Sequence, residues 1–186
     1  MTDKVIWDYL LDKLHNPKGV AAVMGNLMAE SSMRPRCATN LNKTGMTLEE
    51  YIKASNEGKH DFANDGVAFG LVQWCYHTRK LGLLNKAKEC NASVADALVQ
   101  LKYLLEELPK YKTAYNAVIN GTDIAEITKV VMLKYENPAN KGEIAQLKRI
   151  NYAKNYFDKY AVNTINVRCS HNVWEAFYNS LASEFE

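Results

Sequence analysis

Apolar residues return every three or four positions through most of the chain, and this spacing limits the fold more than any other feature. Two stretches near the N-terminus show it best, one with Val5, Tyr9, Leu10 and Leu14, the other with Val20, Val23, Met24 and Leu27. Side chains at this spacing share one face of a helix, which is then buried. The pattern predicts a mainly α fold with helices over residues 3–14, 17–31, 47–56, 74–89, 94–107, 110–119, 123–135, 143–159 and 173–184.

Several helix starts carry their own signals. Pro17 suits the first turn of a helix. The backbone N–H groups of that turn have no partner within the helix, so the missing N–H of proline loses no hydrogen bond. Elsewhere a capping side chain is followed three residues later by an acid, which places acceptors over the unpaired first amides. These pairs are Thr47 with Glu50, Ser93 with Asp96, and Asn172 with Glu175.

Residues 56–72 break the helical period with glycines and turn-forming residues. We expect an irregular loop or a short hairpin there. Connections of this length are uncommon inside compact helical domains and often carry function.

The 186 residues are the usual size of one domain. We assign residues 1–161 to that domain and residues 162–186 to a C-terminal extension. The extension should form a short helix with Trp174, Phe177, Leu181 and Phe185 on one side, packed on the domain or docked onto a partner chain.

Charge and hydropathy exclude several classes of function. The formal net charge is only +2, with lysines and acids interspersed, so no nucleic-acid partner is predicted. No sustained apolar run predicts a membrane span. Cys37, Cys75, Cys90 and Cys169 lie far apart without metal-ligand spacing, so we expect free thiols and neither metal nor cofactor.

Three segments together resemble the lysozyme-like muramidase domain of phage tail and tail-tip lysins. They are Met24-Gly-Asn-Leu-Met-Ala-Glu-Ser-Ser-Met-Arg-Pro35, Phe69-Gly-Leu-Val-Gln-Trp74 and Tyr135-Glu-Asn-Pro-Ala-Asn140. The resemblance runs from about Ile6 to Tyr160. It implies a mainly α lysozyme-like fold with the irregular or hairpin segment lining the cleft, and a Glu-Ser pair that ends a helix beside the substrate. That pair maps onto Glu30 and Ser31.

The residues around Glu30 give a separate reason to consider it a general acid. Glu30 closes an apolar helix that Pro35 cannot continue. The negative end of the helix dipole and partial burial by Met24 or Leu27 both favour a protonated carboxyl. A glycosidase acid must hold such a proton and give it to the departing glycosidic oxygen.

Substrate contacts are expected from Ser31 and from the other two segments. Gly70 would let the backbone approach a ligand, and Gln73 would offer a donor and an acceptor to the sugar. Trp74 either stacks on a sugar face or fills the core. Tyr135 ends a helix before Asn137-Pro138 and presents its hydroxyl to the cleft or the core, while Glu136 is expected to be a structural partner and not a second catalyst.

Sequence alone leaves the second carboxylate open. Inverting glycosidases need a base about 6.5–9.5 Å from the acid, and retaining ones a nucleophile about 5–5.5 Å away. Asp65, in the loop before Phe69, is the first candidate and Asp61 the second, although either could simply form a turn. A lytic transglycosylase would need only Glu30, because a hydroxyl of the sugar closes a 1,6-anhydro ring.

The leading hypothesis is an N-acetylmuramidase that cleaves the β-1,4 bond between N-acetylmuramic acid and N-acetylglucosamine in bacterial peptidoglycan. A lytic transglycosylase and a catalytically silent wall-binding tail protein are the alternatives. The first residues, MTDKVIWDYLLDKL, lack the basic-then-apolar plan of a signal peptide. We therefore expect synthesis in the cytoplasm and action on the wall after lysis or after delivery in the virion, with phage tail proteins as possible partners.

Overall fold

The computed structural model describes residues 1–162. The helix expected over residues 173–184, its cap at Asn172, and the C-terminal extension lie outside the described residues. Within them, helices dominate and the one sheet has two short strands, so the mainly α, lysozyme-like prediction is confirmed.

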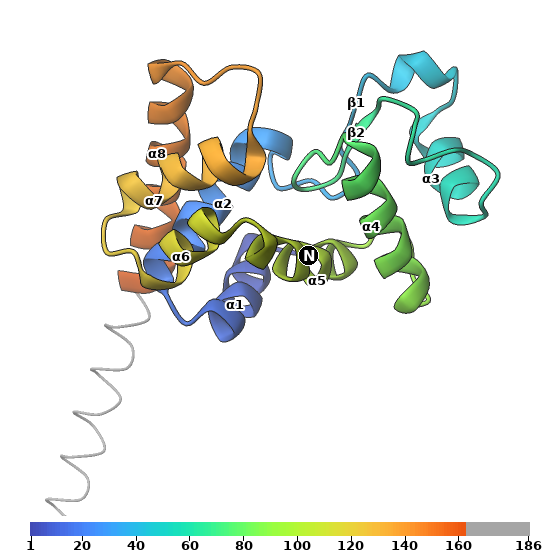
Figure 1. Ribbon diagram of the computed structural model, residues 1–186. Coiled ribbons are helices and arrows are strands. Elements are labelled where there is room, and N and C mark those ends of the chain that lie inside the picture. Colours follow the sequence, from blue (N-terminus) through green and yellow to red (C-terminus); the bar gives the residue numbers. More distant parts are fainter. Residues whose placement is uncertain (163–186) are drawn as a thin grey trace, which may run out of the picture.

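The first lobe is a group of helices around α2 (Pro17–Ser31), shown in Figure 1. Helices α1 (Asp3–Leu14), α6 (Lys112–Asn120), α7 (Ile124–Val131) and α8 (Glu143–Phe157) contact α2. Asn16 caps α2 by accepting a hydrogen bond from the backbone N–H of Lys18, and Pro17 occupies the first turn as predicted. Ten residues of α2 are buried, which makes it the central helix of this lobe.

Glycine allows α2 and α8 to pack very closely. A Cβ at Gly25 would lie 2.7 Å from both the Arg149 carbonyl oxygen and the Ala153 nitrogen of α8. The two backbones can therefore touch only with glycine here. This contact fixes the position of α8, which carries Arg149 toward the end of α2.

The second lobe holds a two-stranded sheet and two helices. Strands β1 (Ala38–Thr39) and β2 (Ala68–Phe69) are antiparallel, with Ala38 opposite Phe69. The turn η1 (Leu41–Thr44) and α3 (Leu48–Asn56) lie between them in sequence, and α4 (His77–Glu89) follows. The predicted capping box of Thr47 and Glu50 starts α3. Rings of Tyr51, Phe62 and Phe69 pack together in this lobe.

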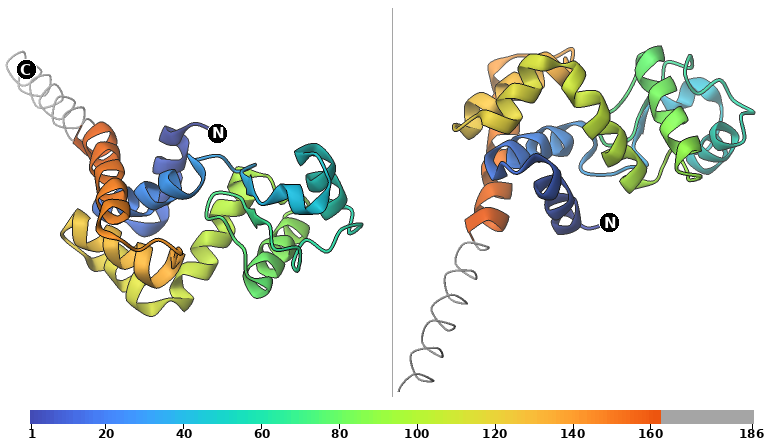
Figure 2. Two further views of the ribbon diagram at one scale, coloured as in Figure 1. Left: turned by 90° about the horizontal axis from the view of Figure 1, so that it is seen from above. Right: turned by 60° about the horizontal axis from the view of Figure 1, so that its bottom comes forward.

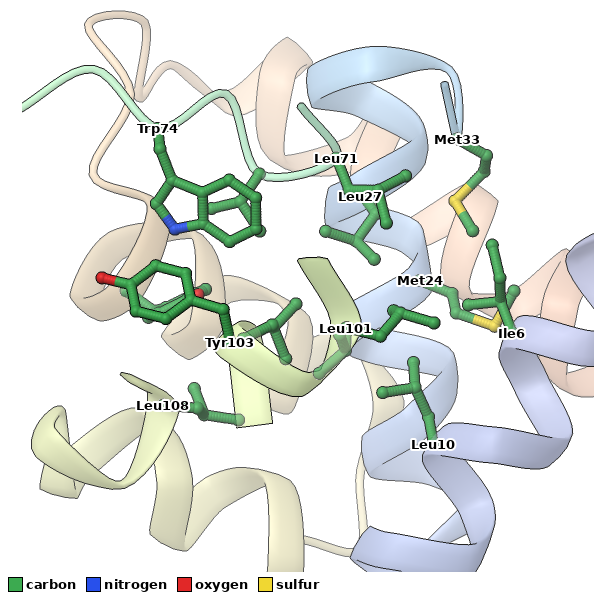
Figure 3. Packing of buried hydrophobic residues seen from close by; sticks show 14 of the residues in the cluster. Ile6, Leu10, Met24, Leu27, Met33, Leu71, Trp74, Leu101, Tyr103 and Leu108 are labelled. Atoms are coloured by element: carbon green, nitrogen blue, oxygen red, sulfur yellow. The ribbon is translucent and has the colours of Figure 1, made fainter. Parts of the chain in front are cut away.

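Helix α5 (Ala97–Glu107) runs between the two lobes, as the views in Figure 2 show. The turn η2 (Leu108–Lys110) then leads into α6. Side chains of α1, α2, α5 and the segment after β2 meet in one core cluster (Figure 3). One hydrophobic core thus spans both lobes.

Several predicted boundaries were wrong for identifiable reasons. The helix expected from residue 74 begins at His77, because the Trp74 backbone exchanges hydrogen bonds with Phe69 in a tight turn. The helix expected from residue 94 begins at Ala97, because Asp96 is the cap, while the Ser93 hydroxyl accepts hydrogen bonds from the Ala95 N–H and the Asn56 side chain.

Two other predicted helices change winding near their ends. Helix α7 stops at Val131 and continues as a π-helical turn, η3 (Met132–Glu136), and α8 continues as a second such turn, η4 (Asp158–Val162). Across residues 1–162, no helix combines the length and apolar character needed to cross a membrane. The three described cysteines, Cys37, Cys75 and Cys90, are free.

Candidate active site

A pocket of about 490 Å³ lies where the two lobes face each other. The first lobe contributes Glu30 from the end of α2 and the segment after η3. The second lobe contributes β1, β2, the turn after β2 and the start of α4. The lining residues are Glu30, Thr39, Ala68, Val72, Gln73, Cys75, Tyr76, Arg79, Glu136, Asn137, Pro138 and Ala139.

Glu30 lies at the last turn of α2, as predicted. Helix α2 ends at Ser31 because Ser32 adopts a left-handed conformation, with φ 54°. The Glu30 side chain is 17% exposed, and its Oε1 accepts a hydrogen bond of 2.7 Å from Nη2 of Arg149, which is itself 8% exposed. The Glu30 carboxyl thus lines the pocket, while the buried Arg149 guanidinium holds it in place.

Glu136 is the second carboxyl on the pocket wall. It is half-buried at the end of η3, where Asn137 turns the chain with φ 50°. Burial and the neighbouring Glu30 carboxylate raise the pKa of Glu136 well above its usual range, against the opposing effects of Arg79 and Arg149. Glu136 therefore holds a proton more readily than an exposed glutamate does.

A buried hydrogen-bond network fixes the walls around Glu136. The Glu107 carboxylate accepts two bonds of 2.8 Å from Arg79, one of 2.9 Å from Trp74 Nε1, one of 2.8 Å from the Tyr135 hydroxyl and one of 3.2 Å from Tyr103. The Arg79 guanidinium also lies 4.8 Å from the centre of the Tyr135 ring. Through this network α4, α5 and η3 hold one another in place.

Gln73 is the predicted substrate-binding residue that lines the pocket. Its amide nitrogen donates to the carbonyls of Cys37 and Gly70, and its Oε1 accepts a bond of 2.6 Å from Thr39. One lone pair of Oε1 is left to receive a hydrogen bond from a ligand. Gly70 lies just behind the wall, with φ 82°, and a Cβ there would meet the Gln100 amide at 2.8 Å. Glycine is thus required at this position by contact with another part of the protein and not by the approach of a ligand.

Three other predicted contact residues are buried and do not reach the pocket. Trp74 is fully buried against Tyr103 (Figure 3), so of its two predicted roles the core one applies. Tyr135 is 2% exposed, and its hydroxyl donates a hydrogen bond to the Glu107 carboxylate. Ser31 is 2% exposed and donates to the Leu27 carbonyl of its own helix. These side chains lie behind the pocket wall and support it from within.

Neither predicted second carboxylate lines the pocket. The Asp65 side chain is 4% exposed and forms an ion pair with fully buried Lys80, while Tyr51 donates to it at 2.7 Å. Burial alone would raise the pKa of Asp65, but hydrogen bonds from Lys80, the Val67 N–H and Tyr51 lower it below the usual range. Asp61 is exposed and accepts hydrogen bonds from Asn64, as a turn residue does. The structure thus places both among the turn-forming alternatives.

The sequence reasoning did not identify two pocket residues, Tyr76 and Glu136, or Arg149, which contacts Glu30. Arg149 lies 119 residues from Glu30 and gives no local signal. Tyr76 is 66% exposed and directly precedes α4, and nothing in the neighbouring sequence marks it as a pocket residue. Glu136 was predicted to be structural, although its place in the Tyr135-Glu-Asn-Pro segment was a usable signal.

A carboxyl at the end of a buried helix faces a pocket between a helical lobe and a lobe that contains the two-stranded sheet, which is the arrangement expected of a lysozyme-like protein. The model of the phage tail lysozyme family matches residues 1–160. The chain belongs to this family, which indicates a lysozyme-like cell-wall hydrolase acting on peptidoglycan. No curated protein matches the sequence significantly.

Proposed function

We propose that this protein is an N-acetylmuramidase that cleaves the β-1,4 bond between N-acetylmuramic acid and N-acetylglucosamine, with Glu30 as general acid. The observation that carries the proposal is the position of Glu30, which reaches an inter-lobe pocket from the end of a buried helix. A glycosidic oxygen beside Glu30 receives its proton as the bond to the sugar carbon breaks. Arg149, at 2.7 Å, then stabilises the carboxylate that remains.

The other walls of the pocket suit a sugar strand. Tyr76 presents an exposed ring, and sugar rings stack on such aromatic faces. Gln73 keeps a free acceptor position for a hydroxyl or an N-acetyl N–H. Tyr76 also borders a second pocket of about 310 Å³, so the binding surface continues past Glu136. A polymer such as peptidoglycan needs an extended surface of this kind.

Replacing Glu30 by glutamine tests the proposal. Glu30→Gln keeps size and polarity but has no acidic proton, so the rate of wall lysis should fall by about two to four orders of magnitude. Turbidity clearing of purified walls measures the rate, and circular dichroism verifies folding. Glu126→Gln, at an exposed position of α7, is the matched control and should clear at wild-type rate. Near wild-type clearing by folded Glu30→Gln would falsify the assignment.

Mass spectrometry of the released muropeptides distinguishes the reaction types. Hydrolysis leaves reducing ends, whereas a lytic transglycosylase leaves 1,6-anhydro ends that are lighter by one water. We expect reducing ends at N-acetylmuramic acid. The site of action also belongs to the proposal: the protein reaches the wall after lysis or as part of the virion, where phage tail proteins would be its partners.

A further inference from the structure

We propose that a second pocket of the cleft binds a carboxylate of the substrate, carried by the N-acetylmuramic acid next to the cleaved bond, and that Arg79 and Lys134 recognise it. The inference rests on the proposed function and names the substrate group that the site would select. This second pocket is the one of about 310 Å³, and it adjoins the pocket that holds Glu30.

The two pockets form one continuous surface. Four residues line both of them, and these are Tyr76, Arg79, Glu136 and Asn137. A sugar that lies beside Glu30 in the first pocket can therefore extend a substituent into the second. Sugars alternate along the peptidoglycan strand, so one of the two that flank the cleaved bond is always N-acetylmuramic acid. The lactyl group of that sugar, or the stem peptide attached to it, is the substituent that carries a carboxylate.

Arg79 has a free edge on the wall that the two pockets share. Its Nε and Nη2 each donate a hydrogen bond of 2.8 Å to Glu107, which occupies one side of the guanidinium. Nη1 forms no hydrogen bond with any residue in the range 1–162. In that part of the chain no side-chain nitrogen is both buried and without a partner, so water reaches Nη1. Nη1 and the second N–H of Nη2 thus present two parallel donors, which match the two oxygens of a carboxylate.

Lys134 brings a second cation to the second pocket. Lys134 is exposed and lines this pocket but not the first. It forms no ion pair or hydrogen bond with another described residue. An unpaired lysine on the same pocket as the free edge of Arg79 favours an anion over a neutral sugar group. A neutral N-acetyl group would gain little from the charge of Lys134.

Glu136 is the residue whose charge could oppose an anionic ligand. Among the described residues, it is the one acid that lines the second pocket. Burial and the Glu30 carboxylate raise the pKa of Glu136, so it takes up a proton more readily than an exposed glutamate does. A ligand carboxylate acts in the same direction, and a neutral Glu136 carboxyl can donate a hydrogen bond to that ligand. The acid on this wall is therefore compatible with a carboxylate in the pocket.

Binding of sugars that cannot be cleaved tests the inference apart from catalysis. N-acetylmuramic acid differs from N-acetylglucosamine only by its lactyl group, and neither monosaccharide has a glycosidic bond to a second sugar. Titration of each into the isotope-labelled full chain, followed by NMR, gives the dissociation constants and the amides that shift. We expect N-acetylmuramic acid to bind about tenfold more tightly, the usual value of hydrogen bonds to a charged group, with shifts at Tyr111 and Tyr135 of the second pocket.

A third sugar identifies the source of the carboxylate. N-acetylmuramic acid that carries an alanyl-isoglutamine dipeptide has its carboxylate on the peptide, because the lactyl group is converted to an amide. Tighter binding of this sugar than of N-acetylmuramic acid assigns the second pocket to the stem peptide. Weaker binding assigns the pocket to the free lactyl group.

Lys134→Gln tests the pocket without disturbing the fold. The change should lower the advantage of N-acetylmuramic acid over N-acetylglucosamine about two- to fivefold, the usual value of an exposed charge pair. Lys129→Gln removes the same charge from an exposed position of α7 outside both pockets, and should leave the advantage unchanged. Arg79→Lys keeps a cation for Glu107 but lacks the free edge. Where circular dichroism shows that this variant folds, the advantage should fall about tenfold.

Two results would overturn the carboxylate site. One is equal binding of N-acetylglucosamine and both muramic acid sugars by wild type, and the other is an equal effect of Lys134→Gln and Lys129→Gln. The proposed function fails separately, through the wall lysis of Glu30→Gln. If the muramic acid sugars are preferred but walls are not cleaved by wild type, the second pocket stands as a wall-binding site and the proposed hydrolysis does not.

Discussion

Among residues 1–162, three carboxylates that are themselves largely buried each face a buried cation, yet only one of them reaches the pocket. Asp65 pairs with Lys80 and Glu107 with Arg79, both inside the protein, while Glu30 pairs with Arg149 at the pocket wall. Buried cations need such partners because an unpaired charge away from water is very costly. At the scale of single residues, exposure to the pocket therefore distinguishes Glu30, the proposed general acid, from the two acids inside the protein.

Asp65→Asn should destabilise the protein without removing its activity. The change leaves Lys80 buried without its counter-ion, and breaking a buried pair costs about 3–5 kcal/mol. Urea unfolding should show a loss in this range, while the specific activity of the folded fraction stays near wild type. Asp61→Asn, at an exposed turn, is the control and should change stability by less than about 0.5 kcal/mol. If the Asp65→Asn protein were stable but inactive, Asp65 would have to take part in the reaction.

The same pair predicts part of the acid sensitivity of the fold. The pKa of Asp65 is lower in the folded state than in the unfolded chain, so the unfolded state takes up the proton first as pH falls. The stabilisation is thus complete above the unfolded value of about 3.9 and is lost as the pH falls through the lower folded value. Urea unfolding of wild type at several acid pH values measures this loss, which should be smaller in Asp65→Asn.

At the scale of elements, the close contact of α2 and α8 positions Glu30, the proposed general acid. Gly25 allows the two backbones to touch, and Arg149 extends from α8 to Glu30 at the end of α2. The residue that permits packing and the residue that holds the acid thus belong to the same pair of helices. A small displacement of α8 would therefore move Arg149 relative to the Glu30 carboxyl.

Gly25→Ala should therefore lower both stability and activity. Its Cβ would lie 2.7 Å from α8 backbone atoms that cannot move independently, and overpacking of this kind costs about 1–3 kcal/mol. We expect a lower melting temperature and slower wall lysis at a temperature where the variant is fully folded. Gly142→Ala is a suitable comparison, because its φ of −61° suits alanine and its nearest neighbour is the end of the Asn140 side chain at 3.2 Å. Equal behaviour of the two variants would contradict this account.

At the scale of the whole molecule, two lobes share one core and leave a pocket between them. Helix α5 and the Glu107 network connect the lobes, so the pocket walls are held by buried contacts rather than by surface loops alone. A cleft supported in this way keeps Glu30, Gln73 and Tyr76 in fixed relation. Such preorganisation favours transition-state stabilisation.

Removal of residues 163–186 should leave wall lysis intact. The family match ends at residue 160, so the removed segment lies outside it. A chain ending at Val162 should unfold in one cooperative transition and cleave walls at a specific activity close to that of the full chain. Calorimetry and turbidity clearing measure both properties. A folded but inactive truncation would mean that residues 163–186 contribute to the site.

Much of the fold could be predicted from the sequence because its signals are local. Helical spacing, Pro17 and the Thr47–Glu50 box indicated α1, α2 and α3 almost to the residue. The boundaries that failed depended on contacts with distant or non-helical partners. The helix at residue 74 was shortened by the turn that pairs Trp74 with Phe69, which the helical period could not reveal.

The sequence by itself determined the helical class, the irregular segment before Phe69, and the place of Glu30 at a helix end, because neighbouring residues set these through periodicity and capping. Only the tertiary structure decided which polar residues share the cleft. Arg149 contacts Glu30, and Glu136 lines the same pocket as Glu30, although both lie more than a hundred residues away along the chain. Asp65 instead forms an ion pair with Lys80 inside the protein. Charges interact through space and not along the chain, so the arrangement of the acids follows from how the helices pack.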